Sequence, residues 1–206
     1  GWIGKNTLLL SRNAGSWFFL GEIFTDIPLE LDKAYSENHC GTCTSCIDVC
    51  PTKAIVAPYK LDARKCISYL TIEHRGEIDI SLRKAMGNRI FGCDDCQVFC
   101  PWNKFANHTN EPDFTPRNNL DKSKLLELFS WSEDEFLKKT EGSAIRRTGF
   151  EGWQRNIAIA LGNANYSPKI IQALERKRLH SSPLVTLHID WALDEQNNAS
   201  PSELRT

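Results

Sequence analysis

The pattern of apolar and polar positions divides the chain into three stretches of different character. In the first, residues 8–10 and 17–24 are rich in apolar and aromatic side chains, which predicts two buried strands joined by a turn at residues 12–15. Between residues 37 and 110 the apolar runs are short and are interrupted by prolines. This interruption is typical of a small domain that is organised by bound metal rather than by a large apolar core.

From residue 122 onward, apolar residues return at helical spacing. Ser132 precedes such a run and is followed three residues later by Glu135, a pattern that indicates a helix N-terminus. Further helices are predicted at 153–163, 168–177 and 183–194, separated by only a few residues, so we expect a solenoid-like layer of paired helices. Residues 195–206 contain few apolar positions and are predicted to be a frayed tail.

Composition places the chain among ordinary globular proteins. It has 206 residues, of which 41% are hydrophobic, and its formal net charge of -1 does not indicate a chain that is basic throughout. No apolar run approaches the roughly 18 to 20 residues that a membrane-spanning helix needs, and no signal peptide is recognisable. We therefore expect a soluble protein without a membrane partner. Because the chain begins at Gly1 inside a glycine-rich turn, we also expect a fragment of a longer protein.

The eight cysteines fall into two runs with one further cysteine between them. The first run has the C-x2-C-x2-C-x3-C-P spacing of two-cluster bacterial ferredoxins. Its members are Cys40, Cys43, Cys46 and Cys50, followed by Pro51. The second run repeats this spacing without its first cysteine, and its members are Cys93, Cys96 and Cys100, followed by Pro101. Cys66 is available to fill the missing place.

In this spacing, three closely spaced thiolates surround one cluster and the last cysteine of the run ligates the other cluster. Exchanging the last cysteines of the two runs predicts two complete sets of four ligands. The first [4Fe-4S] cluster is held by Cys40, Cys43, Cys46 and Cys100. The second is held by Cys50, Cys66, Cys93 and Cys96. Since the sets share both runs, we expect the two clusters to lie close enough for rapid electron transfer.

Two other uses of eight cysteines stay open at this point. Two four-thiolate zinc sites would also consume all eight, although zinc does not require a proline after the last cysteine of each run. A disulfide framework fits less well, because thiols stay reduced in the cytosol and the tight runs suit a metal better than a covalent link between distant elements.

The residues around the cysteines resemble the epoxyqueuosine reductase family over almost the whole chain. The matching stretches are GWIGKN at 1–6, AGSWFFLG at 14–21, CISYLTIE at 66–73, MGNRIFGCDDC at 86–96, CPWN at 100–103, EGSAIRR at 141–147 and RNIAIALGN at 155–163. The resemblance implies a cytoplasmic, cobalamin-dependent iron-sulfur oxidoreductase. Such an enzyme reduces the epoxide of epoxyqueuosine in a tRNA anticodon loop, the last step of queuosine biosynthesis.

The resemblance also implies an α+β architecture in three parts. These are the end of an N-terminal cobalamin-binding α/β domain at 1–36, a bacterial two-[4Fe-4S] ferredoxin-like domain at 37–110 and an α-helical HEAT-like repeat domain at 111–206. Because the family carries its proton-donating aspartate in a segment that we expect to be missing here, we assign no catalytic residue and expect this chain alone to be inactive. We further expect a monomer that receives electrons from an external low-potential donor.

The resemblance suggests two groups of cobalamin contacts. The turn with Gly1, Gly4 and Lys5 belongs to the family's cobalamin domain, and its glycines would let the backbone approach a corrin; the alternative is a structural loop. A second group follows Cys66 closely and could bridge cluster and corrin, although a buried strand is the alternative there. Its members are Tyr69, Leu70 and Thr71.

Basic residues outnumber acidic ones between residues 138 and 178, which favours contact with phosphates of the tRNA. Within this stretch Arg146, Arg147 and Arg155 are the predicted tRNA contacts, and the alternative is an ordinary solvated helix surface. Two other functions stay open: a ferredoxin-type electron carrier fused to a helical interaction domain, and another cobalamin-dependent reductase that acts on a small molecule. RNA binding that weakens steeply with salt would separate the tRNA-modifying enzyme from a carrier.

Overall fold

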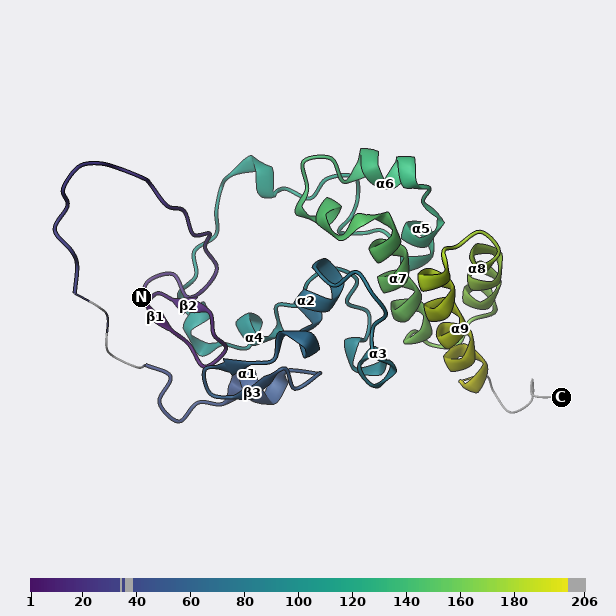
Figure 1. The fold of residues 1–206 in the computed structure, drawn as a ribbon, viewed down its shortest axis with the longest axis horizontal. Helices are drawn as coiled ribbons and strands as arrows, with labels where there is room; N and C mark the ends of the chain where they lie inside the picture. The colour runs from purple at the N-terminus through teal and green to yellow at the C-terminus, as the bar shows by residue number, and fades with distance from the viewer. Residues whose placement is uncertain (34, 36–38, 200–206) are drawn as a thin grey trace. The chain divides into compact units, whose positions relative to one another are not determined.

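The computed structural model describes residues 1–33, 35 and 39–199, which form two compact units (Figure 1). The first unit comprises Gly1–Ala63 and Asp94–Glu111, and the second comprises Arg64–Cys93 and Pro112–Thr206. The chain therefore divides differently from the three parts predicted at 1–36, 37–110 and 111–206, because the segment between the two cysteine runs packs with the helices. No helix in the described part of the chain is long and apolar enough to span a membrane.

The first unit consists of short elements connected by turns. Two small antiparallel sheets pair β1 (Trp2–Ile3) with β2 (Leu9–Leu10) and β3 (Ile55–Ala57) with β4 (Lys60–Leu61). The short helix α1 (Ser45–Val49) packs against α4 (Asp95–Val98), which is followed by the 3-10 helix η2 (Pro101–Phe105). Elements this short bury little apolar surface. Contacts made by the turns therefore supply much of the stability of this unit.

The turn predicted at 12–15 is present, and it closes through a bridge between Ser11 and Gly15. Gly15 has a φ of +62°, and a Cβ atom there would lie 2.9 Å from the Cα atom of Asn103, so only glycine fits. The side chain of Asn103 accepts a hydrogen bond from the Ser16 amide at 2.6 Å and donates one to Gln97 O at 2.7 Å. The turn is thereby fastened to the segment that follows Cys100.

The prediction of a buried strand at 17–24 is wrong. These residues have no regular secondary structure, and all of them except the partly exposed Phe18 are exposed; Phe19 is 84% exposed and Phe24 is 93% exposed. Aromatic content alone suggested burial, but an aromatic segment is buried only where the fold places enough apolar surface against it.

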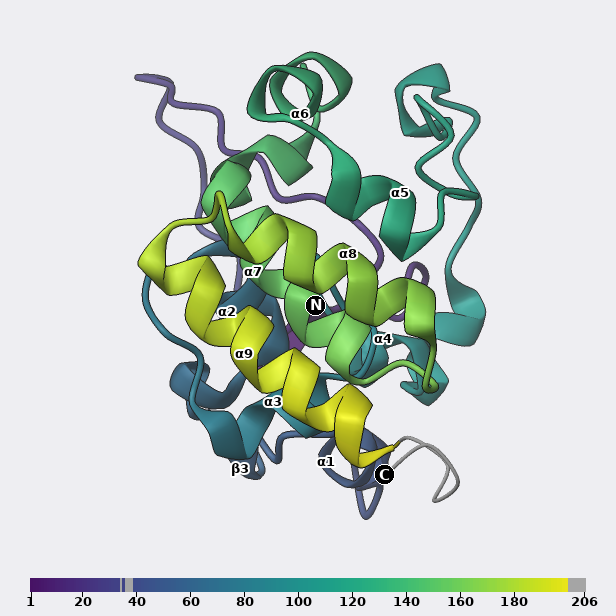
Figure 2. The same ribbon diagram turned by 90° about the vertical axis from the view of Figure 1, so that its right-hand side faces the viewer.

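The second unit is helical. Its elements before the long helices are η1 (Ala63–Lys65, which begins at the end of the first unit), α2 (Ile67–Ile72), α3 (Ile80–Met86), η3 (Pro112–Phe114), α5 (Leu125–Ser130), α6 (Glu133–Lys139) and η4 (Ala144–Thr148). Three long helices follow: α7 (Gly149–Gly162), α8 (Pro168–Arg178) and α9 (Pro183–Asn198). Figure 2 shows α9 lying alongside α7 and α8, in agreement with the packing of α9 against both. The three predicted helices are therefore confirmed.

The core of the helical unit forms around α7, which is buried from Gly152 to Gly162. Phe136, Ile157 and Ile189 are fully buried in it, and the rings of Trp131 and Trp153 stack with their centroids 5.9 Å apart. Gly162 permits the close approach of α9, since a Cβ atom there would lie 2.9 Å from the Cα atom of Ala192. This core holds the remaining helices in place.

Two local predictions in this unit are corrected by the structure. Residues 69–72 lie in α2 rather than in a strand, although β-branched and aromatic side chains favour a strand there. The predicted tail at 195–206 begins later than expected, because α9 continues to Asn198 and the buried Gln196 amide donates to Leu161 O and Ala164 O, both at 2.9 Å. Residues 200–206 lie outside the described part of the chain.

Candidate iron-sulfur site

Four of the predicted ligands converge in the first unit. They line one cavity of about 310 Å³, and they are Cys40, Cys43, Cys46 and Cys100. None of the eight cysteines forms a disulfide. The structure thus brings together the set that the exchanged ferredoxin spacing predicts for the first cluster, including the one cysteine that comes from the second run.

Short helices place these four thiols. Cys46 lies in the first turn of α1, and Cys100 lies at the start of η2, where Pro101 occupies the first helical position. Because α1 and α4 pack against each other, the first cysteine run lies beside Cys96 and Cys100, the two members of the second run that belong to this unit. The side-chain amide of Asn6 also donates to Cys96 O at 3.2 Å, which connects the N-terminal turn to the second run.

Lys5 ties the loop of the first run to the N-terminal turn. Its Nζ donates to Gly41 O at 2.6 Å and to Cys43 O at 2.9 Å, and its side chain lines the cavity. Hydrogen bonds from a charged donor are stronger than neutral ones. Sequence reasoning predicted a cobalamin contact for Lys5, whereas in the structure its ammonium group is directed to the backbone beside the cysteines.

Two rings that line the same cavity, those of His39 and Trp102, belong to a cluster of aromatic side chains. Trp2 is 5% exposed, and its ring lies 4.7 Å from that of His39 and 4.9 Å from that of Trp102, in edge-to-face geometry. The Trp102 indole N–H donates to His39 O at 3.3 Å, and the Tyr35 hydroxyl is hydrogen-bonded to the ring of His39 at 2.7 Å. No sequence signal marked His39, because its contacts with Trp2 and Trp102 join segments that are distant in sequence.

The electrostatics of the four thiols reflect their proximity. Burial raises the pKa of Cys46, and the neighbouring Cys100, Cys40 and Cys43 raise it further. The pKa of Cys100 is raised mainly by burial, while hydrogen bonds from Ser45 lower the pKa of Cys43. Thiols that resist ionisation must still lose their protons to bind metal, so metal binding here releases protons.

The number of cysteines around the cavity is the number that a [4Fe-4S] cluster requires. Among the described residues, no three cysteine, histidine or acidic side chains are arranged to hold one metal ion. A tetrahedral zinc ion requires all its sulfur ligands at about 2.3 Å, whereas a [4Fe-4S] cluster takes each thiolate on a different iron. Four cysteines around one cavity match the number of protein ligands that one such cluster takes.

The other four cysteines are divided between the two units. Cys50 and Cys96 lie in the first unit, where Cys50 Sγ accepts a hydrogen bond from the Ala54 amide at 3.2 Å. Cys66 and Cys93 lie in the second unit, with Cys66 as the N-cap residue of α2. The second set of ligands thus stays a prediction from the sequence.

The residues predicted to contact cobalamin are engaged within the protein. Leu70 and Thr71 are buried, and only Tyr69 of that group is partly exposed. A Cβ atom on Gly4 would lie 2.7 Å from the Leu10 side chain, and one on Gly1 would lie 2.5 Å from Leu10 O, so both glycines permit close backbone packing. The contact of these residues with cobalamin stays a prediction from the sequence.

The predicted tRNA contacts differ in exposure. Arg146 and Arg147 are exposed, and Arg147 forms an ion pair with Glu73 at 2.8 Å. Arg155 is fully buried in α7, and its guanidinium donates to three backbone carbonyls. The prediction for Arg155 is wrong for this structure, because a buried guanidinium whose donors are directed inward is not accessible to a phosphate.

A second cavity, of about 840 Å³, lies in the helical unit and was not predicted. Its walls include Phe129 and Phe150, and the Lys177 ammonium lies 5.7 Å and 5.5 Å from the centroids of their rings. Burial lowers the pKa of Lys177. No sequence signal marks this cavity, because its walls come from α5, α7 and α8, which meet only in the fold.

The chain is similar to known proteins both over the cysteine runs and over nearly its whole length. The family described as "4Fe-4S double cluster binding domain" matches residues 39–103. The curated epoxyqueuosine reductase of Pseudomonas aeruginosa is 58% identical over 193 residues, which are 94% of this chain and 54% of that protein. The epoxyqueuosine reductase of Escherichia coli is 57% identical over 197 residues, 95% of this chain and 51% of that protein.

Solved structures agree with these relatives. The epoxyqueuosine reductase of Streptococcus thermophilus matches 99% of this chain with a TM-score of 0.84 and 32% sequence identity, over 54% of its own chain. An epoxyqueuosine reductase solved with an epoxyqueuosine-modified stem loop of tRNA-Tyr matches 96% of this chain with a TM-score of 0.77 and 29% identity, over 60% of its own chain. The chain thus spans about half the length of the curated relatives it matches.

Proposed function

Because the chain belongs to the epoxyqueuosine reductase family, we propose that it forms the electron-transfer and RNA-binding part of an enzyme that reduces epoxyqueuosine to queuosine in a tRNA anticodon loop. This reduction is the last step of queuosine biosynthesis. The observation that carries the proposal is the cavity lined by four cysteines from both runs, within a chain that resembles epoxyqueuosine reductases along 94% of its length.

Removing an epoxide oxygen requires two electrons, and no amino-acid side chain supplies electrons at low potential. Bound [4Fe-4S] clusters would supply them one at a time. We assign one cluster to Cys40, Cys43, Cys46 and Cys100 and the other to Cys50, Cys66, Cys93 and Cys96. In this proposal Lys5 fixes the loop of the first set, and the ring of Trp102 forms an apolar part of the cavity wall.

Cobalamin is the second proposed cofactor, and this part of the proposal depends on the family resemblance. The proposed contacts are the six residues that the resemblance suggests, of which Tyr69 is partly exposed while Leu70 and Thr71 are buried, and no step is assigned to them. From the same family resemblance we also propose an external low-potential electron donor, a monomeric state and a cytoplasmic location.

The three predicted parts of the chain are also proposed. For residues 1–36, the exposed apolar side chains of the segment 17–31 support membership of a larger cobalamin-binding domain, because large exposed apolar patches mark interaction surfaces. For residues 37–110, support comes from the double-cluster family match at 39–103. For residues 111–206, the successive packing of α7, α9 and α8 supports a HEAT-like arrangement.

For tRNA, we propose that Arg146 and Arg147 contact the phosphates of the anticodon stem loop. Both are exposed and close together at the end of η4. A relative solved with a modified stem loop supports the class of partner. The alternative of a ferredoxin-type carrier is less favoured, because its likeness would be confined to the cysteine runs, whereas these relatives match nearly the entire chain.

The test is turnover by the complete protein that the gene encodes. Supplied with cobalamin, a low-potential reductant and tRNA that carries epoxyqueuosine, it should yield queuosine, detected in nuclease digests by mass spectrometry. Omission of the reductant should abolish the product. A complete, cluster-loaded protein that leaves the epoxide intact while reducing another substrate would refute the proposal.

A further inference from the structure

Arg155 and Asn156 are adjacent polar residues in α7, and both are fully buried. The hydrogen-bond donors of their side chains are directed to backbone carbonyls in two segments of the helical unit. One segment follows Cys66 and the other precedes Cys93. These are the two ligands of the second proposed cluster that this unit contributes.

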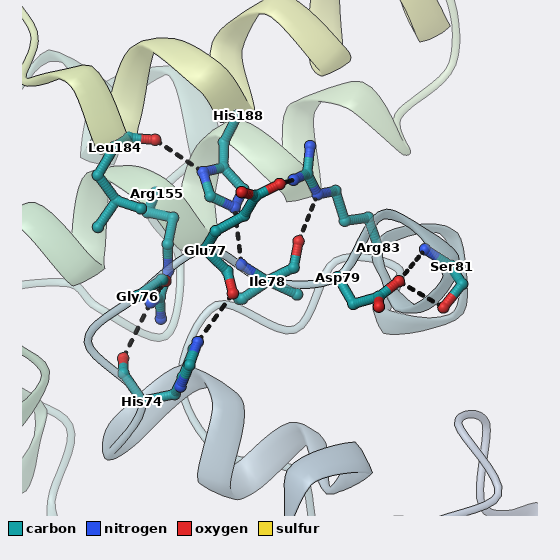
Figure 3. Close-up of polar contacts among 10 residues, drawn as sticks. All are labelled: His74, Gly76, Glu77, Ile78, Asp79, Ser81, Arg83, Arg155, Leu184 and His188. Carbon is teal, nitrogen blue, oxygen red and sulfur yellow. Dashed lines mark hydrogen bonds and ion pairs between the residues drawn. The ribbon is translucent and has the colours of Figure 1, made fainter.

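Arg155 fastens the segment after Cys66. Its Nη2 donates to Leu70 O at 2.7 Å, and its Nη1 donates to His74 O at 2.9 Å and to Gly76 O at 2.8 Å; Figure 3 shows the guanidinium close to His74 and Gly76. The carbonyls at a helix C-terminus attract a positive charge. Because Cys66 is the N-cap residue of α2, holding the end of this short helix also fixes the position of Cys66.

Asn156 connects that segment to the one before Cys93. Its Nδ2 donates to Thr71 O and to Ile90 O, both at 2.9 Å, while its Oδ1 accepts from Arg155 Nη2 at 2.9 Å. One side-chain amide therefore spans two backbone segments that are remote in sequence.

Thr71 makes a second connection between the same segments. Its Oγ1 donates to Ile67 O at 2.7 Å and accepts a hydrogen bond at 2.9 Å from the amide of Gly92, the residue before Cys93. Its own carbonyl also accepts from Thr148 Oγ1 at 2.6 Å. Thr71 thus lies at the centre of the contacts that join the neighbours of the two cysteines.

Burying the charge of Arg155 is energetically unfavourable, which indicates that the positions of its hydrogen bonds matter. Burial lowers the pKa of Arg155 to about 10, and nearby Arg75 contributes to the decrease. A buried charge is tolerated only where hydrogen bonds satisfy it, and an apolar residue of similar volume often serves packing equally well. Fixed donors that reach particular carbonyls do what apolar packing cannot, because they set the positions of those carbonyls.

We propose that Arg155, Asn156 and Thr71 are positioning residues that hold Cys66 and Cys93 at the spacing that one [4Fe-4S] cluster requires. This inference depends on the proposed assignment of ligands to the two clusters. Substitutions in the helical unit should therefore affect one cluster only. The other cluster has all its ligands in the first unit, and these are Cys40, Cys43, Cys46 and Cys100.

Two nearly isosteric substitutions test the proposal. Asn156→Asp keeps an acceptor for Arg155 but loses the donors to Thr71 O and Ile90 O, and Thr71→Val loses the acceptor for the Gly92 amide. In anaerobically prepared protein we expect each variant to shift the midpoint potential and the electron paramagnetic resonance signal of one cluster, or to lose about half of the iron. The signal of the other cluster should not change.

Asn163→Asp is the matched control, because Asn163 also donates to two carbonyls, Arg83 O at 2.8 Å and Gly87 O at 3.0 Å, beside α3 rather than beside a cysteine. It should leave both cluster signals as in the wild type. Thr71→Ser, which keeps the hydroxyl group, should also preserve the wild-type signal. Circular dichroism establishes that each variant is folded, and the two substitutions serve as independent tests if one fails to fold.

Three results would overturn the inference. Wild-type signals in folded Asn156→Asp and Thr71→Val would show that these contacts do not position ligands. Equal changes in Asn163→Asp would show a general loss of stability instead. A wild-type chain without two clusters would refute the ligand assignment itself, which distinguishes failure of the proposed function from failure of the positioning role.

Discussion

Single side chains determine how the cysteine loop of the first unit is held, and Lys5 makes the strongest of these contacts. Its ammonium group reaches two backbone carbonyls, those of Gly41 and Cys43. We expect Lys5→Met to destabilise the loop by roughly 1.5 to 3 kcal/mol, the range for hydrogen bonds from charged groups. The visible absorbance of the loaded protein should then decay several times faster in air.

The control for this prediction is Lys60→Met, which removes an exposed lysine from β4 in the same unit. It should leave the decay rate unchanged. If Lys5→Met and Lys60→Met decay at the same rate as the wild type, then Lys5 does not support the site.

His188 gives a pH dependence to the stability of the helical unit. Its Nε2 accepts from the Ile78 amide at 3.2 Å and its Nδ1 is hydrogen-bonded to Leu184 O at 2.8 Å (Figure 3), so both ring nitrogens are occupied in the neutral form. Burial, together with the charges of Arg83 and Arg155, lowers the pKa of His188 to about 4. The neutral ring is therefore favoured by folding.

His188 binds a proton near pH 6.5 in the unfolded chain but only near pH 4 in the folded chain. The contribution of its neutral ring to stability is therefore complete above pH 6.5 and is lost as the pH falls to about 4. We expect a loss of roughly 3 kcal/mol in the free energy of unfolding across this window. Urea titrations at several pH values measure it, with His188→Gln as the comparison. Parallel pH profiles for the two proteins would contradict this role.

At the scale of elements, helix α6 has a complete capping box. The Ser132 hydroxyl accepts from the Glu135 amide at 3.2 Å, and the Ser132 amide donates to Glu135 Oε2 at 2.9 Å. We expect Ser132→Ala to lower the free energy of unfolding by about 1 kcal/mol, and Ser132→Asp, which keeps an acceptor, to lower it much less. Denaturant titration compares them, and equal stability of all three proteins would disprove the importance of the cap.

Sequence reasoning succeeded for elements with local signals and failed where distant contacts decide. Prolines and periodic apolar residues mark α8 and α9 unambiguously. The helix α2 was expected to be a strand from its composition, and it is stabilised by Arg155, which lies 85 residues after Leu70. The same limit explains why Arg155 itself was mistaken for a surface residue.

In the candidate site, too, local sequence signals could be interpreted, whereas contacts between distant segments could not. The cysteines that line the cavity could be predicted, because ferredoxin ligands have a fixed local spacing. The contributions of Lys5, His39 and Trp102 could not, since each depends on an interaction between segments that are far apart in sequence. Sequence spacing thus identifies ligands, whereas the fold identifies what supports them.

At the scale of the whole molecule, the exposed arginines of η4 should bind RNA mainly through phosphates. We expect the double substitution Arg146→Ala with Arg147→Ala to weaken binding of an anticodon stem loop and to reduce the salt slope by about 1 for each phosphate that is no longer neutralised. Arg178→Ala is the control, because Arg178 is also an exposed arginine but lies in α8, outside η4. An unchanged affinity and slope in the double variant would place the RNA elsewhere.

We propose that the eight cysteines hold two [4Fe-4S] clusters. The most direct test is the iron, sulfide and zinc content of the chain purified without oxygen, measured together with its visible and Mössbauer spectra. We predict a brown protein with about eight iron and about eight sulfide ions per chain, and loss of part of the absorbance in Cys43→Ala and in Cys96→Ala. A colourless protein with about two zinc ions per chain would contradict the claim.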